Sequence, residues 1–245
     1  MRNKTTVNRE EVKKFSLLAE EWWDETGKFK TLHDINPIRI KYIKDNILKH
    51  FQITRAKNPL LNLKILDIGC GGGLLSAPIN RLGASVMGID PAQENIKIAK
   101  QYTIDNGLSI DFQCCTTKEL IKNYSEQFDV VLNMEIVEHV NNVEDFLVES
   151  AELIKNNGMI FIATINKTIK SLIQAKFAAE YLLRWIPIGT HQWKKFIKPE
   201  KIISIMRSEQ LEILDIVGMR FKLFQKKWVL SDTLAVNYII CFKKL

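Results

Sequence analysis

Residues 65–74 read Ile-Leu-Asp-Ile-Gly-Cys-Gly-Gly-Gly-Leu, and this stretch decides the fold. An apolar run leads into a cluster of glycines, which lets the backbone turn tightly and lets a ligand approach the main chain. A helix that begins after such a turn presents unpaired N–H groups in its first turn. The stretch therefore predicts a strand, a ligand-binding turn and a helix in succession.

A regular alternation of apolar runs and helical segments surrounds this stretch. Such alternation is typical of βαβ units and a parallel sheet. Strands are expected at 64–69, 85–90, 110–115, 128–134, 158–165, 211–221 and 236–242, and helices at 74–82, 92–106, 117–123, 143–154 and 200–210. We therefore predict an α/β fold with a doubly wound, mostly parallel, seven-stranded, Rossmann-like sheet.

An acidic residue stands where a nucleoside ligand needs one. Asp90 follows Gly69 by 21 residues and ends the second expected strand, so its carboxylate can accept hydrogen bonds from both hydroxyls of a ribose. The alternating glycines of residues 69–73, preceded by Asp67, have the spacing found in S-adenosylmethionine-dependent methyltransferases. A dinucleotide-binding turn would require Gly or Ala where Leu74 stands. The pattern favours S-adenosylmethionine as cofactor and disfavours a nicotinamide oxidoreductase.

The remaining segments are expected to flank this core. Residues 1–58 read as an N-terminal helical segment covering the cofactor site, with one helix over 12–23 and a second starting at Asn36-Pro37. Residues 59–245 are expected to form the methyltransferase domain. Within it, residues 166–198 interleave basic residues with aromatic and aliphatic ones, which predicts a helical insertion. That insertion is either a lid over the acceptor pocket or an element that contacts a membrane surface.

Composition excludes several classes of protein. Hydrophobic residues make up 46% of the chain and charged residues 26%, which excludes wholesale disorder. No apolar run approaches the ~20 residues of a membrane-spanning helix, and the N-terminus lacks the apolar core of a secretory signal. The four cysteines form no CxxC or zinc-like pattern, and the net charge of +7 comes without a clustered basic tail. We expect a cytoplasmic protein that binds no nucleic acid.

Several blocks of sequence are more specific than the glycine turn. With them, the chain resembles the ubiquinone-biosynthesis O-methyltransferases over nearly its whole length, from about residue 12 to 238. The blocks are the Glu-x-x-x-Lys-Phe region at 11–15, Trp22-Trp23-Asp24, the Phe-Lys-x-Leu-His-x-Ile-Asn-Pro-x-Arg run at 29–39, LDIGCGGG at 66–73, MEIVEHV at 134–140, Thr190-His191, KKFIKP at 194–199 and Val236-Asn237-Tyr238.

The resemblance implies an activity, a setting and a class I methyltransferase fold with an antiparallel last strand. The activity is O-methylation of 2-polyprenyl-6-hydroxyphenol and 3-demethylubiquinol in ubiquinone synthesis. A polyprenylated phenol would be the substrate. Contact with an anionic membrane and with other ubiquinone-biosynthesis proteins would place the protein peripherally at the inner face of the membrane. Two alternatives stay open: another small phenolic acceptor, or a cofactor-binding scaffold of a lipid-associated biosynthetic complex.

The resemblance also implies roles for individual residues. The cofactor-binding set comprises Arg39, Asp67, Gly69, Gly71, Asp90 and Met134, where Asp67 and Gly71 come from the glycine turn itself. Without the resemblance, Arg39 would read as a surface charge on a helix and Met134 as a core residue. Cys114-Cys115-Thr116 follows the third expected strand, where many relatives carry an acid that supports the adenine. The adenine contact is therefore not assigned.

The chemistry of a phenol points to Glu135, Glu138 and His139. A protonated phenol is a poor nucleophile, so it needs a base or a metal ion. The three residues follow the fourth expected strand, at the carboxyl edge where such sheets bind ligands. If a helix begins after Met134, they share one face and match the Mg²⁺ site that the resemblance implies. Two alternatives stay open: Glu138 caps or pairs with a neighbouring base, or His139 is the sole catalytic base with no metal bound. We expect Glu138 and His139 to be the catalytic residues.

Overall fold

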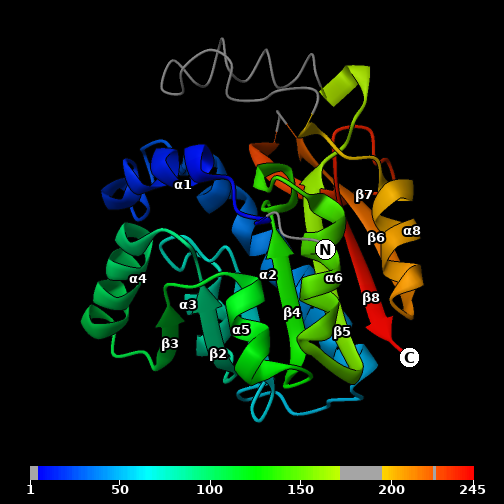
Figure 1. Ribbon diagram of the computed structural model, residues 1–245, viewed down its shortest axis with the longest axis horizontal. Helices are drawn as coiled ribbons and strands as arrows, with labels where there is room; N and C mark the ends of the chain where they lie inside the picture. Colours follow the sequence, from blue (N-terminus) through cyan, green and yellow to red (C-terminus); the bar gives the residue numbers. More distant parts are fainter. Residues whose placement is uncertain (1–4, 172–194, 223–224) are drawn as a thin grey trace.

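An eight-stranded β-sheet organises the computed structural model, which describes residues 5–171, 195–222 and 225–245 (Figure 1). The strand order is β3-β2-β1-β4-β5-β8-β6-β7. The strands are β1 (Lys64–Ile68), β2 (Ser85–Ile89), β3 (Ile110–Gln113), β4 (Phe128–Met134), β5 (Ile154–Ile165), β6 (Leu211–Lys222), β7 (Lys227–Ser231) and β8 (Asn237–Lys244).

Strands β1 to β5 run parallel to one another, and β8 runs antiparallel to both β5 and β6. The carboxyl ends of the five parallel strands lie toward the top of Figure 1. The doubly wound, mostly parallel α/β fold with an antiparallel last strand is thus confirmed. The count of seven strands is wrong among the described residues, because β7 pairs with β6 as an additional antiparallel edge strand. This strand is short and half-exposed, so it lacks the buried apolar run that identified the others.

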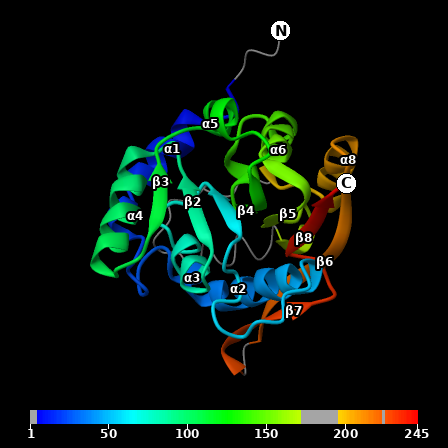
Figure 2. The same ribbon diagram turned by 90° about the horizontal axis from the view of Figure 1, so that it is seen from below.

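Helices cover both faces of the sheet, as Figure 2 shows end-on. On one face, α2 and α3 share a core cluster with the sheet. On the other, α5, α6 and α8 form the second cluster, while α4 packs beside the edge strand β3. These helices are α2 (Lys30–His50), α3 (Ser76–Arg81), α4 (Gln93–Asp105), α5 (Thr117–Tyr124), α6 (Val143–Glu152) and α8 (Pro199–Ser208).

Strand β5 shows why the central strands read as continuous apolar runs. Ile160 and Ile162 face the α5–α6–α8 layer, whereas Met159 and Phe161 face α2 and α3. Successive side chains of a strand point to opposite faces, and both faces here are covered by helices. Residues 158–164 of β5 are therefore all buried.

The N-terminal helix is shorter than the sequence predicted. Helix α1 covers Arg9–Ser16, and the Asn8 side chain caps its first turn by accepting hydrogen bonds from two backbone N–H groups. The predicted helix over 12–23 is wrong beyond Ser16, because the chain turns at Leu17, whose side chain is 77% exposed. A short 3₁₀ turn, η1 (Ala19–Glu21), then leads the following residues onto the glycine turn.

Helix α2 also departs from the prediction, because it begins at Lys30 and carries Pro37 in its interior. A proline in a helix removes one backbone hydrogen bond and costs about 3 kcal/mol. Burial of apolar side chains along the same helix, including Ile35, Ile43 and Ile47, offsets this cost. The Asn36 side chain donates to the Leu74 carbonyl at 3.1 Å and so attaches the helix to the glycine turn. Most of the predicted insertion at 166–198 lies outside the described residues.

Candidate active site

The glycine turn between β1 and α3 is held in a backbone conformation that disfavours side chains. Gly69 and Gly71 have φ angles of +71° and +54°, in the left-handed region that glycine tolerates. A Cβ on Gly69 would lie 2.7 Å from the Ile136 side chain, and one on Gly71 would collide with the Trp22 ring. Close approach and backbone conformation therefore both select glycine at these two positions.

Asp90, at the end of β2, is hydrogen-bonded to this turn. Its Oδ2 accepts from the Gly71 N–H at 3.0 Å, and its Oδ1 accepts from the Ala92 N–H at 2.8 Å and from Asn95 Nδ2 at 3.3 Å. Burial raises the pKa of Asp90 above its ordinary value. Each carboxylate oxygen has two lone-pair directions, so Asp90 can position the turn while its Oδ2 still accepts one further hydrogen bond.

Asp67 lies deeper, in β1, and is 3% exposed. Its Oδ2 accepts a hydrogen bond from the Ser76 hydroxyl at 2.6 Å, which connects β1 to the first turn of α3. Burial raises the pKa of Asp67 to about 6, and the neighbouring Asp90 charge adds to this effect. In this arrangement Asp67 supports the glycine turn from below.

Two tryptophans cover the turn. The Trp22 ring stacks on Phe29 with a centroid distance of 3.8 Å, and its Nε1–H donates to Asn95 Oδ1 at 2.9 Å. Trp23 donates from Nε1 to the Gly72 carbonyl at 3.0 Å and stacks on Tyr102 of α4. A hydrogen-bonded chain thus runs from Trp22 through Asn95 to Asp90.

A pocket opens beside Asp90 at the carboxyl edge of the sheet. Gly69 and Asp90 form part of its wall, and His139 lines it further along. Other lining residues come from α1 and its preceding segment (Thr6, Val7, Asn8, Glu11, Val12, Phe15), from the start of α5 (Cys115, Thr116, Thr117) and from the strand ends and helices around them (Ile68, Ile89, Pro91, Asn95, Ile136, Val140, Phe146). Of the expected site residues, Arg39, Asp67, Gly71, Met134, Glu135 and Glu138 are outside this lining.

Arg39 and Glu135 form an ion pair beside the glycine turn. Arg39 projects from α2, is 4% exposed, and donates from Nη2 to the Glu135 carboxylate. Its Nε is buried and has no hydrogen-bond partner among the described residues. Glu135 follows β4, which ends at Met134, in a left-handed conformation with φ of +57°. The guanidinium, which the resemblance assigns to cofactor binding, therefore pairs here with a carboxylate of this chain.

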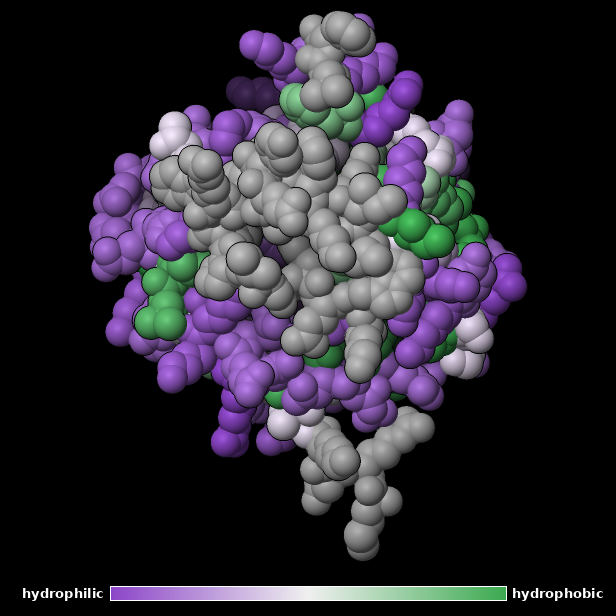
Figure 3. Space-filling model, turned by 90° about the horizontal axis from the view of Figure 1, so that it is seen from above, coloured by the Kyte–Doolittle hydropathy of each residue, from purple (hydrophilic) through white to green (hydrophobic). Residues whose placement is uncertain are grey.

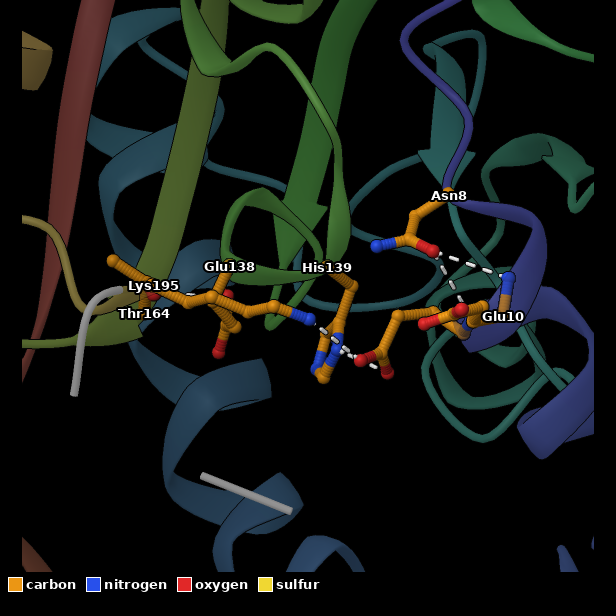
Figure 4. Close-up of polar contacts among 7 residues, drawn as sticks. Asn8, Glu10, Glu138, His139, Thr164 and Lys195 are labelled. Carbon is orange, nitrogen blue, oxygen red and sulfur yellow. Dashed lines mark hydrogen bonds and ion pairs between the residues drawn. The ribbon is translucent and has the colours of Figure 1, made fainter. Parts of the chain in front are cut away.

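Glu138 and His139 belong to the 3₁₀ turn η2 (Val137–His139) and point to different partners (Figure 4). Glu138 Oε2 accepts a hydrogen bond from the Thr164 hydroxyl at 2.8 Å. Burial raises the pKa of Glu138 to about 7, and the negative charge of Glu135 adds to the effect. A carboxyl group with this pKa is suited to exchanging a proton at neutral pH.

His139 contacts α1 instead of its neighbours in sequence. Its Nδ1 lies 3.0 Å from Glu11 Oε2, and the Glu11 Oε1 accepts from Lys195 Nζ at 2.8 Å. The hydrogen bond from His139, together with Lys195, lowers the pKa of Glu11 to about 2. Sequence reasoning missed Glu11 and Lys195 as site residues, although both lie in blocks that carried the family resemblance, the 11–15 region and KKFIKP.

The expected Mg²⁺ ligands do not converge in this arrangement. A helix after Met134 would have aligned Glu135, Glu138 and His139, but the left-handed residue 135 and the 3₁₀ turn separate them. Their side chains pair with Arg39, with Thr164 and with Glu11, respectively. Among the described residues, no three His, Cys, Asp or Glu side chains are placed to hold a metal ion. The donor set present here therefore does not fit a magnesium site.

Comparison with known proteins agrees with the geometry of the glycine turn. Residues 66–162 match the family model described as a methyltransferase domain. The fold is similar to magnesium protoporphyrin IX methyltransferase from Synechocystis PCC 6803, whose structure contains bound SAH. The TM-score is 0.60 at 17% identity, covering 94% of this chain and 99% of that one. A likeness at this identity shows a shared fold.

Two curated relatives are much closer in sequence. A ubiquinone biosynthesis O-methyltransferase from Pelagibacter ubique is 52% identical over 98% of this chain and 99% of its own length. A protein of the same name from Rhizobium etli is 46% identical over 98% of this chain and 97% of its own length. Identity at this level over essentially the whole of both chains means that the protein belongs to the family of ubiquinone biosynthesis O-methyltransferases.

Proposed function

We propose that this protein transfers a methyl group from S-adenosylmethionine to a phenolic hydroxyl of 2-polyprenyl-6-hydroxyphenol and of 3-demethylubiquinol during ubiquinone synthesis. Family membership supports the reaction class. The observation that carries the proposal is the placement of a carboxyl and an imidazole side chain just past β4, beside the pocket that Asp90 and Gly69 line. These are the buried Glu138, with its pKa of about 7, and His139 in the pocket wall.

The first task of the site is to hold the cofactor. Gly69, Gly71 and Asp90 are proposed to contact it, with Asp90 Oδ2 accepting a hydrogen bond from a ribose hydroxyl. Arg39 is proposed to bind the carboxylate of the methionine moiety, for which its buried, unpartnered Nε is a donor. Met134, at the end of β4, is also proposed to contact the cofactor. Asp67 would stabilise the glycine turn through its hydrogen bond with Ser76.

The second task is to deprotonate the acceptor and align it. Bound S-adenosylmethionine supplies an electrophilic methyl group on a sulfonium. His139 takes the phenol proton on Nε2. None of the described residues forms a hydrogen bond with this nitrogen. Loss of this proton gives a phenolate, which is the nucleophile that the bound cofactor would methylate. Alignment of donor and acceptor can supply ~7–11 kcal/mol of the barrier reduction.

Glu138 is proposed to act beside His139. At neutral pH a carboxyl group with a pKa of about 7 is partly protonated. It can therefore hold the second hydroxyl of a catechol by donating or accepting a hydrogen bond, and it can stabilise the imidazolium that forms on His139. Because the residues present do not fit a magnesium site, no step of this proposal passes through a metal ion.

Residues 1–58 are proposed to cover the cofactor site, since α1 lines the pocket and Trp22 lies on the glycine turn. The described helices include none that is both long and apolar enough to cross a bilayer. On the face above the carboxyl ends of the strands, the described residues are mainly hydrophilic with hydrophobic groups between them (Figure 3). Contact of this side with an anionic membrane and with other ubiquinone-biosynthesis proteins, and a cytoplasmic location at the inner face of the membrane, remain proposals from the sequence.

The test is a methyl-transfer assay with purified protein, labelled S-adenosylmethionine and a short-chain prenylated catechol, run with Mg²⁺ and with EDTA. We expect turnover by the wild type to persist in EDTA. We expect turnover to be lost in His139→Ala. Turnover that requires the metal would show that the three side chains rearrange to bind it and would overturn the metal-free mechanism. Cofactor binding without turnover of prenylated catechols or hydroquinols would favour another phenolic acceptor or the scaffold role.

A further inference from the structure

Glu11 lies between two cationic or hydrogen-bonding groups that come from distant parts of the chain. It is 128 residues before His139 and 184 before Lys195, yet its two carboxylate oxygens contact one of them each. In Figure 4 the labelled Lys195 and His139 side chains lie close together, and dashed lines lead from both to one carboxylate. The Glu11 side chain is 14% exposed and that of His139 is 18% exposed, so water competes little for this contact.

The contact decides which nitrogen of His139 carries the proton. A carboxylate that also accepts from the Lys195 ammonium offers only lone pairs, so the nitrogen 3.0 Å from Glu11 Oε2 must be an N–H donor. A neutral imidazole has one N–H group, and the nitrogen in contact is Nδ1. The other nitrogen, Nε2, is then left with a free lone pair.

The orientation of the ring is fixed by the same helix. Phe15, one turn after Glu11, packs edge-on against the His139 ring with a centroid distance of 5.2 Å and an interplanar angle of 89°. The Asn8 cap fixes the start of the helix by accepting from the backbone N–H of Glu11 at 3.4 Å. Just before α1, backbone carbonyls accept hydrogen bonds from the backbone and side chain of Asn141, two residues after His139.

We propose that Glu11 is a positioning residue that holds His139 in the tautomer protonated on Nδ1 and so leaves Nε2 to take the proton of the acceptor hydroxyl. The role of Nε2 as base rests on the proposed function, whereas the tautomer does not. When the proton moves from the phenol oxygen to Nε2, the Nδ1–H remains bonded to the Glu11 carboxylate, which stabilises the resulting imidazolium. The catalytic base therefore depends on Glu11 of α1 as well as on His139 of η2.

The test compares Glu11→Gln with Glu10→Gln in the full-length protein. Glu10 is the matched control because it is the neighbouring, exposed residue of the same helix. Two-bond ¹H–¹⁵N spectra of protein labelled in the histidine rings report the tautomer directly, and His139→Gln identifies the signals of His139. The wild type and Glu10→Gln are expected to show the Nδ1–H tautomer, and Glu11→Gln a mixture of both tautomers. The kcat of Glu11→Gln should fall roughly 10- to 100-fold, the range for lost partners that orient a functional histidine, with cofactor affinity unchanged.

An unchanged tautomer in Glu11→Gln would overturn the proposal, and so would a changed tautomer with full kcat. A merely structural tie between α1 and the Lys195 segment would alter the unfolding midpoint without altering the tautomer. If Glu11→Gln does not fold, Glu11→Asp decides the question, since it keeps the charge but is too short to reach Nδ1, and the same tautomer change is expected. If the wild type methylates no prenylated catechol, the proposed function fails, while the spectra still decide the tautomer.

Discussion

Replacing Asp67 by Asn should change how the stability of the protein depends on pH. The carboxyl group is buried beneath the glycine turn, and its pKa is raised from 3.8 to about 6 in the folded protein. Because the folded state disfavours the ionised form, the stability contributed by the neutral form is fully present below pH 3.8. It is lost as the pH rises through about 6. Asn has nearly the same shape and does not ionise, so Asp67→Asn removes this dependence.

The magnitude follows from the two pKa values. One pH unit between the folded and unfolded pKa corresponds to about 1.4 kcal/mol, so the full effect is ~3 kcal/mol. Since the unfolded group is already largely ionised at pH 4.5, about 2 kcal/mol of it falls between pH 4.5 and pH 8. Asp90 and Glu138 also have raised pKa values, with the same sign. Both remain in the variant, so the difference between the two proteins isolates Asp67.

The assay is urea unfolding of the cofactor-free wild type and of Asp67→Asn, followed at pH 4.5 and at pH 8. The free energy of unfolding of the variant, relative to that of the wild type, should rise by about 2 kcal/mol between the two pH values. Any change in the hydrogen bond to Ser76 shifts the variant equally at both and cancels. Parallel pH profiles for the two proteins would refute the reasoning, because they would mean that Asp67 is not desolvated.

Four further substitutions test the site. Trp22→Ala removes a ring stacked on Phe29 and should lower the free energy of unfolding by about 3–5 kcal/mol; urea titration checks this, and a loss below 1 kcal/mol would mean that the ring is not packed. Gly71→Ala places a Cβ against the Trp22 ring at a φ of +54° and should abolish cofactor binding, measured by calorimetry; wild-type affinity would contradict the close approach. Glu138→Ala and His139→Ala should each lose most turnover while cofactor binding survives, and full turnover in either would remove that residue from the mechanism.

Much of the fold could be predicted because, in the centre of the sheet, apolar runs in the sequence coincide with buried strands in the structure. The central strands β1, β4 and β5 are covered on both faces, so each carries a mainly apolar, buried run. The prediction is wrong where a strand is only partly buried, and where packing elsewhere in a helix offsets the cost of an unfavourable residue. β7 is half-exposed at the sheet edge. The sequence predicts that α2 starts at Asn36-Pro37, because proline is favoured in the first turn of a helix. The helix instead begins at Lys30, because the packing of its apolar side chains outweighs the cost of an interior proline.

The candidate site was less predictable because its contacts join distant parts of the sequence. Spacing places Glu135, Glu138 and His139 at the carboxyl edge of the sheet, as the position of β4 confirms. It does not reveal the left-handed backbone at Glu135 or the partners that come from α1 and α2. The contact between Glu11 and His139 spans 128 residues, and neither helical nor strand periodicity reports on pairs so far apart.

The position of β8 has a consequence for synthesis on the ribosome. β8 is the last of the described strands to be translated, yet it lies inside the sheet and pairs with β5 on one side and β6 on the other. The β6–β7 hairpin therefore has no bonded neighbour in the sheet until β8 leaves the exit tunnel. During that interval the nascent chain exposes two apolar strand edges, which are preferred sites of aggregation and chaperone binding. A premature stop codon shortly before Asn237 would leave both edges open permanently, so we expect such a product to be degraded.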